Sequence, residues 1–248
     1  MKKTRIIGII PARYGSTRFP GKALARISGK PMIRHVYERA KKASLVGKVM
    51  VATDDERIAR VVRDFGGEAV MTPAGCASGT DRVARAAKKI PCDIVVNIQG
   101  DEPLIPPSVI DGAVRLLISD KSAVMGTVVK RITDKKEIDD PDVVKAVVDR
   151  NGYAVYFSRA AIPSPACAAG KSVFYKHMGI YAYRRKFLLR LTRIKPSYLE
   201  KTERLEQLRV IEGGYRIKAY VSRHDSIAVD TRRDIKKVIK KLGIRRKK

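Results

Sequence analysis

The sequence predicts an α/β protein with a mostly parallel central sheet and an antiparallel extension. In the first half, short apolar runs alternate with amphipathic segments, which is the pattern of right-handed βαβ units in a parallel sheet covered on both faces. From about Met125 to about Arg184 the apolar runs follow one another closely, with few helices between them, as in an antiparallel sheet. We therefore expect two successive regions of different strand direction.

The first half supplies four strands that read as buried on both faces, at residues 5–10, 48–53, 68–71 and 93–98. The amphipathic segments between and after them predict helices at 30–43, 54–67, 78–90 and 106–117. Pro31 is expected at a first helical position, and Ser78 stands three residues before Asp81, which is the spacing of a capping box. Loops after the strands should gather at one rim, where ligands of such sheets bind.

The second half predicts strands at 125–132, 143–149, 153–158 and 175–183. Strict alternation in 175–183 places His177, Gly179 and Tyr181 on one face. Two helices are expected afterwards, at 203–214 and at 231–242, the second with an apolar stripe opposite a lysine-rich face. A lone histidine is more often structural than functional, and Glu206 and Gln207 would ordinarily be surface residues.

Composition restricts the class of protein. No apolar run is long enough for a transmembrane helix, and the N-terminal segment lacks the features of a signal peptide, so we expect a cytoplasmic protein without a membrane partner. Cys76, Cys92 and Cys167 are widely spaced and indicate neither a disulfide framework nor a zinc site. The net charge of +28 would suit a polyanionic partner, but the basic residues are spread along the chain and no aromatic-rich recognition module accompanies them. We therefore expect no nucleic-acid partner.

The loop "PARYGSTRFPGK", residues 11–22, follows the first predicted strand and resembles a Walker loop only superficially. Five residues separate its glycines, and alanine follows the lysine, so the Walker pattern is not met. Arg13, Arg18 and Lys22 nevertheless supply several cations around a flexible backbone, which suits a triphosphate. The alternative is an ordinary basic connection between a strand and a helix.

Two carboxylates are candidate magnesium ligands. Asp101 in "VNIQGDEPLI" follows a buried strand and could hold a magnesium ion together with phosphate oxygens, or it could form a turn before Pro103. Asp230 in "IAVDT" could be a second ligand, but locally Asp230 or Thr231 reads better as the N-cap of the last helix. From local sequence alone the cap is favoured.

Taken together, these segments resemble the 3-deoxy-manno-octulosonate cytidylyltransferase (CMP-Kdo synthetase) family. The matching blocks occur in the family's order and span nearly the whole chain: "IIPARYGSTRFPGKAL", "GKPMIRHVYERA", "VATDDERIA", "SGTDRVA", "VNIQGDEPLI", "YFSRAAIP", "HMGIYAYR", "LEQLR" and "VDTRRDI". The resemblance implies a Rossmann-like nucleotidyltransferase fold and transfer of CMP from CTP to an acidic eight-carbon sugar with Mg²⁺. It also implies a homodimer with its interface in the later antiparallel region.

The resemblance further implies one domain, 1–248, in three parts. These are a nucleotide-binding half (1–124), an antiparallel sugar-binding and dimerisation region (125–225), and a closing strand with a basic C-terminal helix (226–248).

The resemblance also assigns roles to individual residues. The implied nucleotide-binding residues are Arg13, Ser16, Arg18, Lys22, Arg82 and Gln99. The implied metal ligands are Asp101 and Asp230, which reverses the local interpretation of Asp230, and the implied catalytic residues are Arg13, Lys22, Asp101 and Asp230. The implied sugar-binding residues are Arg159, His177, Tyr181, Glu206 and Gln207.

Two alternatives remain open at this stage. The chain departs from the family's pattern in "SPACAAGKSVFYKH", in "SRHDSIAVDT" and in "SGTDR", mostly near the implied sugar side. A sister enzyme that activates another acidic sugar, such as 8-amino-Kdo or another ulosonic acid, is therefore the nearer alternative. A non-catalytic polyanion-binding protein, motivated only by the charge, is the more distant one.

Overall fold

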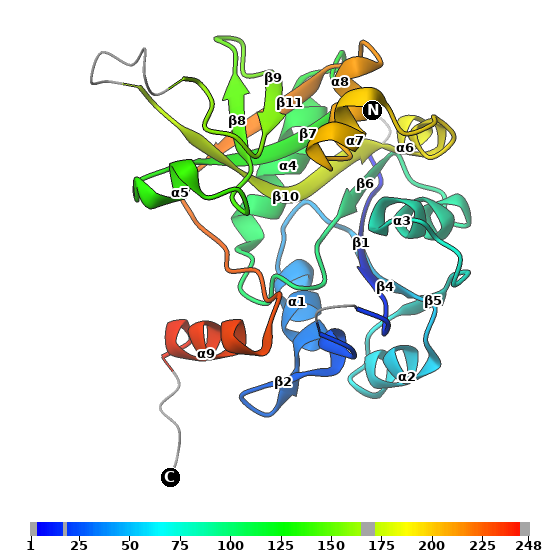
Figure 1. Cartoon of the computed structure of the whole chain (residues 1–248). Helices are drawn as coiled ribbons and strands as arrows, with labels where there is room; N and C mark the ends of the chain where they lie inside the picture. The colour runs from blue at the N-terminus through cyan, green and yellow to red at the C-terminus, as the bar shows by residue number, and fades with distance from the viewer. Residues whose placement is uncertain (1–3, 17–18, 165–171, 244–248) are drawn as a thin grey trace. The chain divides into compact units, whose positions relative to one another are not determined.

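The computed structural model of the protein describes residues 4–16, 19–164 and 172–243 (Figure 1). The chain forms two compact units. Unit 1 comprises residues 1–111 and 225–248, and unit 2 comprises residues 112–224. The three parts expected from the sequence had their boundaries at 124/125 and 225/226, whereas the two units meet at 111/112 and 224/225. The organisation of the chain as a single domain stays a prediction.

Unit 1 contains a parallel sheet that confirms the four predicted strands to within two residues. Its strand order is β6-β1-β4-β5. The bounds are β1 Ile6–Ala12, β4 Lys48–Thr53, β5 Ala69–Met71 and β6 Ile94–Asn97. Every residue of β6 and nearly every residue of β1 and β4 is buried, because helices cover both faces. The carboxyl ends of these strands meet at one rim.

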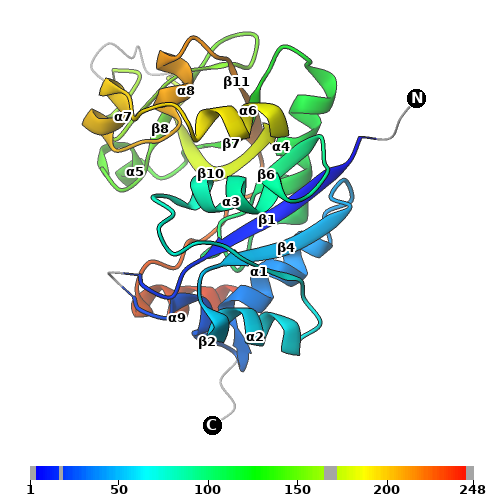
Figure 2. The same ribbon diagram turned by 90° about the vertical axis from the view of Figure 1, so that its right-hand side faces the viewer.

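The predicted helices of unit 1 are present with slightly shorter bounds: α1 Met32–Lys41, α2 Glu56–Asp64 and α3 Gly79–Lys88. Helices α1 and α3 lie on opposite faces of β1 and β4 (Figures 1 and 2). Ser78 and Asp81 form the expected capping box at the start of α3. Pro31 is the residue before α1, since it also pairs in the short hairpin of β2 (Arg26–Ile27) and β3 (Lys30–Pro31).

The C-terminal part of unit 1 corrects one prediction. Residues 226–230 form no strand: the segment makes a single backbone bond to the neighbouring loop, from Val229 N–H to the Asp101 carbonyl at 2.8 Å. The chain turns at Asp101, and this contact is not extended into a strand pairing on either side. Helix α9 (Arg232–Lys241) then packs its apolar stripe into a cluster around Val229 and Val238. This packing anchors the chain's end beside the rim.

Unit 2 contains a mixed sheet, with the predicted antiparallel strands and one strand that the sequence did not reveal. Its bounds are β7 Met125–Arg131, β8 Lys145–Val148, β9 Ala154–Ser158, β10 Tyr175–Arg184 and β11 Ile217–Ser222. Strand β10 pairs antiparallel with β7 and β8, and β8 pairs antiparallel with β9. The additional strand, β11, pairs with β7 in parallel. A register shift interrupts β10 between Met178 and Tyr181.

The helix predicted at 203–214 in unit 2 is not continuous in the structure. The expected helix at 203–214 is two short helices, α7 (Tyr198–Glu203) and α8 (Leu208–Glu212). Arg204 adopts φ 55°, in the left-handed region, which ends α7 and prevents a continuous helix. The other helices are α4 Pro107–Ser119, inside which the boundary between the units falls, α5 Lys136–Asp139 and α6 Arg185–Leu191. A 3-10 turn, η1 Lys22–Leu24, belongs to unit 1.

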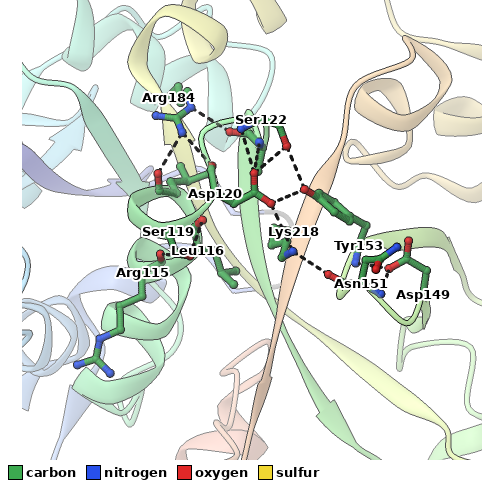
Figure 3. Close-up of polar contacts among 12 residues, drawn as sticks. Arg115, Leu116, Ser119, Asp120, Ser122, Asp149, Asn151, Tyr153, Arg184 and Lys218 are labelled. Carbon is green, nitrogen blue, oxygen red and sulfur yellow. Dashed lines mark hydrogen bonds and ion pairs between the residues drawn. The ribbon is translucent and has the colours of Figure 1, made fainter.

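A polar network fixes the connection between α4 and β7 within unit 2 (Figure 3). Arg184 donates to the carbonyls of Ala123, Leu117 and Asp120 at 2.9, 3.0 and 3.0 Å. The carboxylate of Asp120 accepts from the hydroxyl of Tyr153 and lies 3.3 Å from the ammonium of Lys218. Hydrogen bonds to this carboxylate, of which the one from Tyr153 has the largest effect, lower the pKa of Asp120.

Within the described residues no helix is long and apolar enough to span a membrane.

Candidate active site

A cavity of about 370 Å³ opens at the rim of unit 1. Its size lies within the range of small-molecule sites, about 300–1,000 Å³. It brings together all the described residues that the sequence assigned to nucleotide or metal: Arg13, Ser16, Lys22, Arg82, Gln99, Asp101 and Asp230. Arg18 lies outside the described residues, so its assignment stays a prediction. Side chains from the loop after β1, from α3, from the loop after β6 and from the C-terminal segment therefore converge on one space.

Lys22 occupies the centre of the acidic side of this cavity. Its Nζ donates to Asp101 Oδ2 at 2.7 Å and lies 3.5 Å from Asp230 Oδ1. Gly21 places Lys22 there: it adopts φ 68°, and its N–H bonds to the Tyr14 carbonyl at 2.9 Å. The two carboxylates thus face one cationic atom, although 129 positions of sequence numbering separate Asp101 from Asp230.

The helix-cap alternative for Asp230 is resolved by its neighbours. Thr231 is the N-cap of α9, and Asp234 completes the capping box. Asp234 Oδ2 accepts from the Thr231 hydroxyl at 2.9 Å and from the Thr231 N–H at 3.0 Å. The Asp230 side chain is therefore not needed as a cap and lines the cavity instead.

The loop after β6 approaches β1 very closely at Gly100. A Cβ atom on Gly100 would lie 2.8 Å from the Pro11 carbonyl, so only glycine fits here. In the same loop, burial raises the pKa of the Glu102 carboxyl to about 7, and the negative charge of Asp101 adds to this shift. The glycine thus allows Gln99 and Asp101 to reach the cavity from a loop pressed against β1.

Arg82 is a buried cation in the cavity wall, only 3% exposed. Its guanidinium donates to Thr72 Oγ1 at 2.6 Å and to Asp54 Oδ2 at 2.8 Å. Asp54 could not be identified from the sequence as the partner of Arg82, because 28 residues separate the two. Ser78 and Gly79, at the N-terminus of α3, also line the cavity and were missed. The capping box could have indicated these two residues, because it marks a helix N-terminus, whose backbone N–H groups can bind anions.

The donor set of the cavity suits a magnesium ion held together with phosphate. Two carboxylates are too few to enclose a metal, and in the described part of the chain no group of three or more His, Cys, Asp or Glu could hold one. Mg²⁺ typically takes one or two carboxylates, and the substrate's phosphates supply further oxygens. Asp101 and Asp230, which already share one cationic neighbour, fit that requirement.

The residues that the sequence assigned to the sugar all lie in unit 2. Tyr181 donates to Gln207 Oε1 at 3.2 Å, and the rings of His177 and Tyr181 lie 5.3 Å apart, so these three form one group. Gln207 is buried, contrary to the surface position that is ordinary for glutamine, and its Nε2 has no partner among the described residues. Glu206 lies beside it, 3.9 Å from Arg209, and its charge adds to the burial that raises the pKa of Tyr181.

Arg159 is held separately from this group. Its Nε donates to the Glu203 carbonyl at 3.1 Å and its Nη1 to the Pro141 carbonyl at 2.9 Å. Its backbone N–H donates to the Glu203 carboxylate at 3.0 Å. The guanidinium is therefore oriented by backbone carbonyls, and among the described residues it makes no contact with His177 or Tyr181.

A parallel βαβ unit with a cation-lined cavity at its rim is typical of enzymes that bind nucleotides or other phosphates. Comparison with known proteins agrees: residues 7–217 match the family model described as cytidylyltransferase. The chain is 53% identical to the 3-deoxy-manno-octulosonate cytidylyltransferase of Geotalea uraniireducens over 248 residues, covering 96% of this chain and 99% of that protein. It is 52% identical to the enzyme of the same name from Geobacter metallireducens, covering 96% and 98%. The chain therefore belongs to the cytidylyltransferase family, and within it to the 3-deoxy-manno-octulosonate cytidylyltransferases.

Solved structures agree with this assignment. The structure of CMP:2-keto-3-deoxy-manno-octonic acid synthetase complexed with CTP superposes with a TM-score of 0.93 at 41% identity, covering 97% of this chain and 99% of that one. A 4-diphosphocytidyl-2C-methyl-D-erythritol synthase from Anaerococcus prevotii shares the fold alone, with a TM-score of 0.66 at 11% identity, covering 98% and 100%. The predicted Rossmann-like nucleotidyltransferase fold is confirmed.

Proposed function

We propose that the protein transfers CMP from CTP to the anomeric hydroxyl of 3-deoxy-D-manno-octulosonate (Kdo), giving CMP-Kdo and pyrophosphate. The observation that carries this proposal is the convergence of Asp101 and Asp230 on Lys22 in a cavity that also contains Arg13 and Arg82. The names of the relatives and the CTP complex of the similar structure support the nucleotide and the sugar.

The residues of the cavity match the needs of this reaction. The sugar hydroxyl attacks the α-phosphate while pyrophosphate leaves, so the protein must chiefly position the reactants and neutralise charge. Arg13, Ser16 and Lys22 supply donors from the loop after β1, and Arg82 supplies a fixed cation held by Asp54. No nucleophilic side chain is needed, because the sugar itself attacks.

The proposed cofactor is Mg²⁺, held by Asp101 and Asp230 with phosphate oxygens. When bound, the metal would neutralise phosphate charge and lower the pKa of the attacking hydroxyl. Lys22, which lies between the two carboxylates, keeps their charges compensated in the free enzyme. Arg159, His177, Tyr181, Glu206 and Gln207 are the proposed sugar-binding residues.

We also propose that a second copy of the chain binds unit 2. Strand β11 pairs with β7 along its length and otherwise makes an isolated bridge from Lys218 to Tyr153. Two consecutive residues of it, Tyr220 and Val221, are 37% and 46% exposed. Val155 and Tyr198, also in unit 2, are 53% and 73% exposed. Apolar side chains exposed in this way favour an interface between two copies of the chain.

Sedimentation should give a dimer for the wild type and a monomer for Val221→Glu. A monomeric wild type would contradict the proposal. The resemblance to the CMP-Kdo synthetase family also leads us to propose a cytoplasmic location.

The decisive experiment measures pyrophosphate release with every combination of CTP, Mg²⁺ and Kdo. Release is expected only when all three are present, and Asp101→Asn should abolish it without unfolding the protein. Asp64→Asn, an exposed carboxylate at the end of α2, is the matched control and should retain full activity. Turnover with another ulosonic acid but not with Kdo would favour the sister enzyme. Salt-sensitive RNA or DNA binding that survives Asp101→Asn, without turnover, would favour the polyanion-binding alternative.

A further inference from the structure

Thr127 holds a position in unit 2 that the sequence did not single out. It lies on β7, is fully buried, and contacts β10 through its hydroxyl. The Thr127 Oγ1 atom lies 2.9 Å from Nε2 of His177 and 2.9 Å from the carbonyl oxygen of Ile180. One hydroxyl group therefore contacts both an imidazole and a backbone carbonyl.

The protons of this group of atoms can be assigned by counting. A hydroxyl has one hydrogen to donate, and a carbonyl oxygen can only accept. The hydrogen of Thr127 is therefore committed to Ile180, which lies where β10 shifts its register against β7. The remaining contact then requires His177 Nε2 to carry a hydrogen and donate it to Thr127 Oγ1.

The surroundings of His177 favour the neutral ring. Phe157 packs edge-on against it at 4.9 Å, and Tyr181 lies at 5.3 Å. Burial lowers the pKa of His177 to about 3, with no contribution from a charged neighbour. A neutral ring with a hydrogen on Nε2 has an unprotonated Nδ1. No described residue bonds to this Nδ1, and the His177 side chain is only partly buried, so Nδ1 is left as an acceptor for a ligand.

We propose that Thr127 is a positioning residue that fixes His177 as the neutral Nε2–H tautomer, so that Nδ1 accepts a hydrogen bond from a hydroxyl of the acidic sugar. This inference rests on the proposed function for the identity of the ligand, but the tautomer itself does not. It assigns His177 to a hydroxyl and excludes it as a cationic partner for the sugar's carboxylate. Thr127 acts only through His177 and does not touch the sugar.

The tautomer is tested first, in the free enzyme, by ¹⁵N NMR of histidine-labelled protein, with the His177 signals identified by their loss in His177→Gln. The expected spectrum shows a protonated Nε2 and an unprotonated Nδ1, unchanged between pH 8 and pH 6. A protonated Nδ1, or an imidazolium in this range, would overturn the proposal. In Thr127→Val the protonation should be shared between the two nitrogens, and Thr127→Ser should restore the wild-type pattern.

The ligand is tested next, by adding Kdo to the labelled enzyme with and without CTP. The Nδ1 signal should move towards the hydrogen-bonded range in the wild type as Kdo binds. The KM for Kdo should rise about tenfold in Thr127→Val, as expected for one lost hydrogen bond, with the KM for CTP unchanged. Thr127→Ser should lie within about threefold of the wild type. Binding of Kdo without a change at Nδ1 would refute the role assigned to His177. An Nε2–H tautomer in a protein that neither binds nor turns over Kdo would instead refute the proposed function.

Discussion

The ammonium of Lys145 donates a hydrogen bond to the backbone carbonyl of Arg159 at 2.6 Å. Lys145 is completely buried, and its ammonium also donates to the carbonyls of Asp140 at 2.8 Å and Val143 at 2.6 Å. Burial lowers the pKa of Lys145, and three carbonyl acceptors compensate for the lost water. Lys145 thereby connects the start of β8 to Arg159, which directly follows β9 and is one of the proposed sugar-binding residues.

Lys145→Met should destabilise the protein by about 2–4 kcal/mol, because three buried carbonyls lose their donor. It should also raise the KM for Kdo, since the carbonyl of Arg159 is no longer held. Urea unfolding and steady-state kinetics measure the two effects. Lys186→Met, an exposed lysine on α6, is the control and should change neither. An unchanged unfolding free energy for Lys145→Met would show that the three bonds contribute nothing.

Asp230 and Asp234 should separate catalysis from folding. Asp230→Asn should lower turnover by about 10²–10³-fold, as expected when charge compensation in an active site is lost, and should leave stability nearly unchanged. Asp234→Asn should cost about 1 kcal/mol of stability, because it weakens the cap of α9, and should affect turnover far less. Thermal unfolding and pyrophosphate release distinguish the two variants. The reverse pattern would make Asp230 the structural residue.

Gly100→Ala tests the close approach of the loop after β6 to β1. Its Cβ would lie 2.8 Å from the Pro11 carbonyl, and relieving that contact must displace the loop that carries Gln99 and Asp101. Overpacking of this kind costs about 1–3 kcal/mol, and the affinity for CTP should fall. Gly75→Ala, where an added Cβ meets nothing within 4 Å, should behave as the wild type. Calorimetric titration with CTP measures the affinities.

The parallel half was predictable because its signals are local. The apolar run of β4 and the capping box of Ser78 and Asp81 each determine a short element without reference to the rest of the chain. Strand β11 was missed because its alternation of Ile217, Ala219 and Val221 is short, and its pairing with β7 joins segments that are far apart in the chain. The split of the helix expected at 203–214 was missed because it depends on the left-handed conformation of Arg204, a residue type that gives no such signal.

The candidate site was predictable only as far as its residues stand in motifs. Asp101 and Asp230 were found in motifs, but their common contact with Lys22 depends on tertiary packing. Asp54 and Thr127 act through partners 28 and 50 residues away, and no spacing rule connects such pairs. Buried polar partners of site residues are therefore what sequence reasoning fails to find.

The stability of the protein should fall in mildly acidic solution partly because of His177. Burial lowers the pKa of His177 to about 3 in the folded state, whereas the ordinary value is 6.5. Below about pH 6.5 the unfolded chain takes up a proton that the folded chain does not, so stability falls with pH until about pH 3. His177→Gln should therefore lose about 1–2 kcal/mol less than the wild type between pH 7 and pH 5. Urea unfolding at both pH values measures this, and His224→Gln, an exposed histidine, serves as the control.

The backbone bond from Val229 to Asp101 has a consequence for the way the protein is made. Residues 1–111 supply most of the cavity, but one wall of it comes from residues 225–248, which are synthesised after the whole of unit 2. A nascent or prematurely terminated chain would hold Arg13 and Lys22 without Asp230 opposite them. We therefore expect the cavity to be complete only after unit 2 has been synthesised, and a fragment that ends before Asp230 to be inactive.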